Sequence, residues 1–87
     1  MRINEGFILK EIAGNYVIVP VGENLLDFSS MITINETGAF LWPLLSENSV
    51  DELTKKLTSE YDIDTQTAKA DIEEFIKMLS DNKILEA

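Results

Sequence analysis

Carboxylate side chains are the main groups in this sequence that could take part in chemistry. The chain contains no cysteine and no histidine. It therefore offers no thiolate nucleophile, no imidazole base and none of the usual ligands of a transition metal. Sixteen Asp and Glu residues remain, against seven Lys and Arg residues. Catalysis or metal binding would depend on how these carboxylates are spaced.

One group of acidic and amide residues has the spacing of a calcium-binding loop. Asp62, Asp64, Gln66 and Glu73 fall at positions 1, 3, 5 and 12 of that template. Position 6 is Thr67, although the sharp turn of such a loop needs glycine there, and the following residues have helical character. We therefore expect no metal, no cofactor and no catalytic constellation, and we expect that the protein is not an enzyme.

The composition limits the location and the partners of the chain. Its 87 residues are 45% hydrophobic, which is enough for one small domain over residues 1–87. No apolar run approaches the roughly 20 residues of a membrane span, and the N-terminus lacks the apolar region of a signal peptide. We expect a cytoplasmic, free-standing protein. The net charge of −9 argues against binding to nucleic acid or to an anionic membrane.

The predicted secondary structure changes from strands to helices at Asn35. Segments rich in β-formers lie before it, and we predict strands at about 7–12, 16–20 and 28–34. The short connection Ala13-Gly14-Asn15 suits a hairpin, so the strands form an antiparallel meander whose outer edges are the first and third strands. Asn35 is a good N-cap, and helices follow it.

Three helices are predicted, at about 36–45, 50–61 and 65–81. Pro43 should kink or shorten the first. Ser49 and Glu52 form a capping-box pattern for the second, and Asp64 caps the third, which carries a clean amphipathic stripe. Ile84 and Leu85 should fold back onto the sheet or the core. The result is an α+β domain, a three-stranded meander followed by three helices, with a winged-helix-like order of elements.

The ordered set of these segments resembles the PqqD-like proteins, the recognition elements for ribosomally made and modified precursor peptides. The resemblance rests on three segments that cover nearly the whole chain: FILKEIAGNYVIVP, ITINETGAFLWPLL and SVDELTKKLTSEYDIDTQTAKADIEEFIKMLSDNKIL. It implies a non-catalytic, chaperone-like module that binds the leader of a precursor peptide. The module would present this leader to a modifying enzyme, often a radical-SAM enzyme.

In members of this family the leader adds as a strand to the third strand of the sheet and lies beside the third helix. The physics of an open strand edge agrees with that arrangement, because its unpaired N–H and C=O groups can bind an added strand. The residues that the resemblance implies as peptide-binding are Phe28, Ser30, Met31, Ile32, Thr33, Ile34, Asp71, Glu74, Phe75, Met78 and Asn82.

Several of these side chains also have a purely structural interpretation. Met78 suits a surface that receives varied apolar groups, but it equally fits the margin of the core. Phe28 and Met31 can simply pack on the sheet. Asp71 and Glu74 could pair with basic residues of a leader, but they fit a solvated acidic face better. Trp42 is favoured as a core residue over a contact with an enzyme.

The sequence departs from PqqD proper at two places. Segment 34–38 is Ile-Asn-Glu-Thr-Gly instead of the family's aliphatic-Asn-x-Ser-Ala, and Glu47-Asn48 stands where an Asp-Gly is usual. These differences favour a precursor peptide other than that of the quinone cofactor.

Two other function classes remain open. One is a winged-helix nucleic-acid binder or regulator, against which the acidic charge of the predicted third helix argues. The other is a small homodimeric scaffold, because a strand edge that accepts a leader can also accept a second copy.

Overall fold

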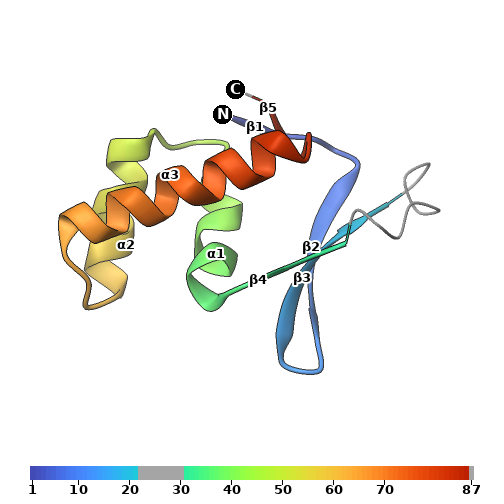
Figure 1. Cartoon of the computed structure of the whole chain (residues 1–87), viewed down its shortest axis with the longest axis horizontal. Helices are drawn as coiled ribbons and strands as arrows, with labels where there is room; N and C mark the ends of the chain where they lie inside the picture. The colour runs from blue at the N-terminus through green and yellow to red at the C-terminus, as the bar shows by residue number, and fades with distance from the viewer. Residues whose placement is uncertain (22–30, 87) are drawn as a thin grey trace.

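The computed structural model describes residues 1–21 and 31–86 and has an α+β fold, as predicted. An antiparallel sheet in the order β2-β3-β4 is formed by Phe7–Ile12, Asn15–Pro20 and Ile32–Ile34. Helix α1 (Glu36–Leu41), the 3-10 helix η3 (Trp42–Leu44), α2 (Val50–Glu60) and α3 (Thr65–Asp81) follow. Figure 1 shows the β2–β3 hairpin projecting beside the helices.

A second, small sheet joins the two ends of the described chain. Strand β1 (Arg2–Ile3) pairs antiparallel with β5 (Leu85–Glu86), with Ile3 opposite Leu85. Figure 1 shows β1 and β5 side by side at the end of α3. The sequence did not predict this pairing, because two-residue strands carry no measurable periodicity. It did predict that Ile84 and Leu85 return to the core, and both are buried.

The hairpin closes through a two-residue turn at Ala13 and Gly14. Their φ angles are +52° and +83°, so both residues adopt the left-handed conformation of a type I′ turn. This turn matches the right-handed twist of the flanking strands. Gly14 adopts it without strain, whereas Ala13 pays the steric cost of its Cβ atom.

Asn35 turns the chain from β4 into α1. Its extended backbone (φ −85°, ψ 178°) ends the strand, and its side-chain oxygen accepts a hydrogen bond of 2.9 Å from the Gly38 N–H. The first helix is shorter than the predicted 36–45. Its α-helical part stops at Leu41 and Pro43 lies in η3, because proline removes a helical donor and clashes with the preceding turn. The predicted shortening at Pro43 is confirmed.

The predicted caps of α2 and α3 are also present. Ser49 and Glu52 form a reciprocal capping box, and the Asp64 carboxylate accepts a bond of 2.7 Å from the Thr67 N–H. Helix α2 ends at Glu60, one residue before its predicted end. Residues 66 and 73 of the calcium-loop template lie inside α3, and the described residues contain no cluster of three potential metal ligands. None of the described helices is both long and apolar enough to cross a membrane.

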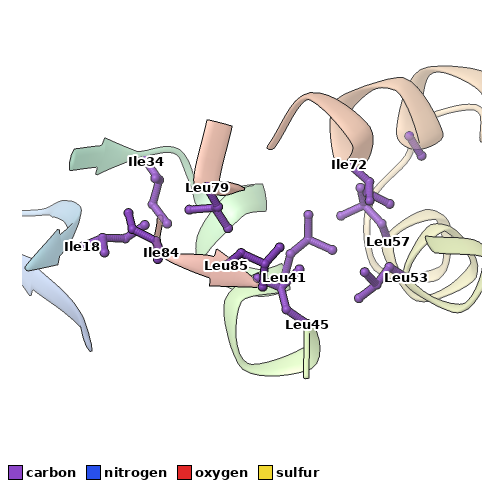
Figure 2. Packing of buried hydrophobic residues seen from close by; sticks show 11 residues of the cluster. Ile18, Ile34, Leu41, Leu45, Leu53, Leu57, Ile72, Leu79, Ile84 and Leu85 are labelled. Carbon is purple, nitrogen blue, oxygen red and sulfur yellow. The ribbon is translucent and has the colours of Figure 1, made fainter. Parts of the chain in front are cut away.

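One hydrophobic core connects the inner face of the sheet with all the helices. Figure 2 shows it extending from Ile18 and Ile34 on the strands to Leu53 and Leu57 on α2. Its buried members are Ile18, Ile34, Leu41, Leu45, Leu53, Leu57, Ala68, Ile72, Leu79, Ile84 and Leu85. Trp42 is half-buried and packs against this core, in line with the favoured interpretation. The core fixes α3 against the inner side of β4.

The third strand is shorter than the predicted 28–34 in the part that the structure describes. Strand β4 begins at Ile32, and Met31 precedes it outside the strand. The predicted strand residues 28–30, which include Phe28 and Ser30, lie outside the described residues.

Candidate functional site

Strand β4 forms an edge of the three-stranded sheet, and its register fixes which backbone groups face outward. In the hairpin, the Val21 N–H donates to the Gly6 carbonyl over 2.8 Å. Bonded and non-bonded pairs alternate along an antiparallel ladder, so Val19 and Val17 also bond toward β2. Tyr16 and Ile18, which alternate with these valines, bond in the other direction, toward β4.

Within residues 1–21 and 31–86, no strand pairs with the outer side of β4, and Thr33 is the residue of β4 whose backbone groups face that side. Ile34 lies opposite Tyr16 and Ile32 opposite Ile18, so both isoleucines direct their N–H and C=O groups toward β3. Thr33 lies between them, opposite Val17, and its N–H and C=O groups point away from the sheet. These two groups can accept one residue of an added strand.

The side chains of β4 alternate in the same way. Ile34 is only 8% exposed and belongs to the core, and Ile32 packs against that core, whereas Thr33 is exposed on the outer face of the sheet. A strand that pairs with Thr33 would therefore direct the two neighbours of its paired residue toward the inner face, where α3 lies.

A groove of about 340 Å³ lies on that inner side, next to the open edge. Residues of β4, of the first turns of α1 and of one stripe of α3 surround it. The lining residues are Thr33, Ile34, Asn35, Thr37, Gly38, Leu41, Asp71, Glu74, Phe75 and Met78. In Figure 1, α3 and β4 run in opposite directions, so the C-terminal end of β4 corresponds to the earlier part of α3.

The floor of the groove is apolar and closely packed. Leu41 is only 2% exposed, and Phe75 and Met78 are half-buried against the core. At Gly38 a Cβ atom would lie 3.3 Å from Cε1 of Phe75 and 3.4 Å from Cβ of Ile34. A glycine at this position thus lets α1 approach α3 and β4 closely.

The charged groups around the groove are all acidic. Asp71 and Glu74 line it with exposed side chains, and none of the described lysines or arginines does. Tyr16, opposite Ile34 on β3, is outside the lining of the groove and lies near two other carboxylates. The Glu11 carboxylate raises the pKa of its phenol, first by its charge and then by a hydrogen bond, and the charge of Glu36 adds to this shift. The site can therefore offer backbone hydrogen bonds, apolar contact and attraction for a cation.

The groove brings together six of the predicted site residues, namely Thr33, Ile34, Asp71, Glu74, Phe75 and Met78. Three others lie apart from its lining. Met31 is 43% exposed before the start of β4, and Ile32 faces the core. The Asn82 amide donates a bond of 2.8 Å to the Met78 carbonyl at the end of α3.

Helix α1 also contributes to the groove, which was not predicted from the sequence. Asn35, Thr37, Gly38 and Leu41 line the groove, although the sequence suggested only a strand and the third helix. The Asn35 cap could have indicated that these residues lie near β4, because a helix that starts directly at the end of β4 must place its first turn beside that strand.

A second groove, of about 420 Å³, is lined by residues of α1, η3 and α2. Its lining consists of Phe40, Leu44, Lys55, Lys56, Ser59 and Glu60. Unlike the groove at β4, it is lined by two lysines, and none of its described lining residues belongs to a strand.

The fold has a counterpart among solved structures. The structure described as TbiB1 in complex with the TbiA(beta) leader peptide is similar, with a TM-score of 0.77 and 23% sequence identity. The similarity covers 100% of this chain and 96% of that one. At this identity the likeness establishes the shared fold. No curated protein matches the sequence.

The family model for coenzyme PQQ synthesis protein D (PqqD) matches residues 15–85. The match includes β3, β4 and every helix, and so all the residues that line the groove at β4. The chain belongs to the PqqD family.

Proposed function

We propose that this protein binds the leader segment of a ribosomally made precursor peptide at the open edge of β4. In this proposal the leader adds as an antiparallel or parallel strand to Thr33 and lies in the groove against α3. The observation that carries the proposal is the combination of an outward-facing backbone edge with an adjoining apolar groove. Membership of the PqqD family, and a similar fold that was solved in complex with a leader peptide, support it.

The role we propose is recognition without catalysis. Backbone groups and the groove lining supply affinity, and the bound leader holds the rest of the precursor near a modifying enzyme. Such a tether raises the effective concentration of the precursor at the enzyme, so that even micromolar affinity suffices. A radical-SAM enzyme as the partner and a cytoplasmic location are part of this proposal.

A binding assay with divided precursor peptides tests the proposal. A fluorescently labelled leader, the leaderless core of the same precursor and a DNA duplex would be titrated with the full chain at low salt. We expect saturable binding of the leader alone. Equal binding of the core peptide, or binding of the duplex in preference to either peptide, would contradict the proposal. Sedimentation of the chain alone would show whether a second copy occupies the edge instead.

A further inference from the structure

The two lysines of α3 lie outside the lining of the groove. Asp71, Glu74 and Met78 recur at intervals of three and four residues and line the groove. Lys69 and Lys77 lie about 80° apart around the helix axis, at about 100° per residue. Neither of them is among the groove-lining residues.

The two carboxylates of the groove are not neutralised within the described part of the chain. The ion pair found there joins Arg2 to Glu86 over 4.0 Å, at the far end of α3. A concave surface that carries charges of one sign concentrates the field and attracts a counter-charge. Here that counter-charge would be positive.

Along α3 the acidic residues of the groove, Asp71 and Glu74, come before the apolar ones, although Phe75 directly follows Glu74. The rise from Glu74 to Met78 is about 6 Å along the helix axis. Side chains two residues apart on one face of a strand are about 6.8 Å apart. A strand beside β4 can thus place one side chain near the carboxylates and the next inward-facing one over Met78 and Phe75.

The pairing at Thr33 determines which two side chains of the leader enter the groove. The leader residue that pairs with Thr33 points outward, as Thr33 does, and the residues before and after it point inward. One of them lies at the Ile34 end and the other at the Ile32 end. Because α3 and β4 run in opposite directions, the Ile34 end is the end nearer the carboxylates.

We propose that this groove selects leaders that carry a Lys or Arg two positions from a bulky apolar residue, with the basic side chain at Asp71 and Glu74 and the apolar one on Phe75 and Met78. This inference rests on the proposed function. An antiparallel leader places the basic residue first, and a parallel leader places it second. The order found by experiment therefore reports the direction of the bound strand.

A display library of random 12-residue peptides, selected on the full chain, tests the inference. We expect peptides with a basic and an apolar residue two positions apart. In a selected peptide, Lys→Gln should weaken binding about three- to tenfold in 50 mM salt and less than about twofold in 500 mM salt, because exposed charges are screened.

Variants of α3 supply the matched control. The double variant Asp71→Asn/Glu74→Gln should lose the preference for the basic residue and keep the preference for the apolar one. Glu73→Gln removes the same charge from the neighbouring position, whose carboxylate is outside the groove lining, and should keep both preferences. Thermal melts would confirm that each variant is folded.

The outcomes separate this inference from the proposed function. Selected peptides that fail to bind a folded Thr33→Pro variant need the open edge of β4. If such peptides lack a basic residue, the inference is overturned and the proposed function stays intact. An unchanged basic preference in the double variant would also overturn it. Selected peptides that bind Thr33→Pro as well as the wild type would overturn the proposed function itself.

Discussion

Replacing Thr33 by proline should disable the open edge of β4 while leaving the sheet intact. The Thr33 N–H faces away from β3, so proline removes no hydrogen bond of the ladder. Proline also restricts the residue before it to extended conformations, which Ile32 already adopts within β4. The variant should therefore stay folded.

The expected loss of leader binding follows from one hydrogen bond and one steric block. A lost backbone hydrogen bond costs about 0.5–1.5 kcal/mol, which corresponds to a factor of about 2 to 12 in Kd. The proline ring also fills the space that the added strand must occupy. We expect the Kd of the leader to rise about tenfold or more.

Fluorescence anisotropy of a labelled leader measures this change, and circular dichroism with a thermal melt checks the fold. Thr33→Val is the matched control, because it keeps the backbone N–H and the β-branched shape and alters only the exposed hydroxyl. It should bind the leader within about twofold of the wild type. A folded Thr33→Pro variant that binds the leader as tightly as Thr33→Val would refute strand addition at this edge.

Two further predictions concern the fold that holds the site. Ala13→Asn should stabilise the protein by about 1 kcal/mol and raise the Tm by about 4–8 °C, because asparagine tolerates the positive φ of the turn better than alanine; an unchanged or lower Tm in a thermal melt would contradict this account of the hairpin. The hydrogen bond from the Thr67 N–H, together with that from the Thr67 hydroxyl, lowers the pKa of Asp64 from its usual value of 3.8. The ionised Asp64 carboxylate therefore stabilises the folded protein at a pH above 3.8, and this stabilisation is lost as the pH falls through the lowered pKa. Asp64→Asn keeps a capping oxygen but does not titrate. The Tm of the wild type should therefore exceed that of this variant by less at pH 3 than at pH 6. A constant difference in Tm over that range would show that the charge of the carboxylate does not stabilise the cap.

Local signals in the sequence predicted the elements that have strong caps. Asn35, Ser49 with Glu52, and Asp64 each start a helix at the predicted residue, because each satisfies N–H groups of the first helical turn within a few residues of chain. The effect of Pro43 was equally local. These interactions need no knowledge of the rest of the fold.

The features that the sequence did not predict depend on contacts between distant segments. The β1–β5 pair joins the first and last residues of the described chain, and neither strand is long enough to show a pattern. The Asn35 cap indicates that the first turn of α1 lies beside β4, but the close approach of α1 to α3 at Gly38 depends on how Phe75 and Ile34 pack there. The family resemblance predicted that the third strand and the third helix form the site. The structure shows that α1 also lines the groove.

The most direct test of strand addition at β4 is an amide NMR titration of the labelled protein with a candidate leader peptide. A DNA duplex at low salt is the control. The account predicts that the peptide alone shifts the amide signals of Thr33 and Ile34 and those of the groove-lining part of α3, from Asp71 to Met78. Shifts centred instead on Lys55 and Lys56 in the second groove, or produced by the duplex, would contradict it.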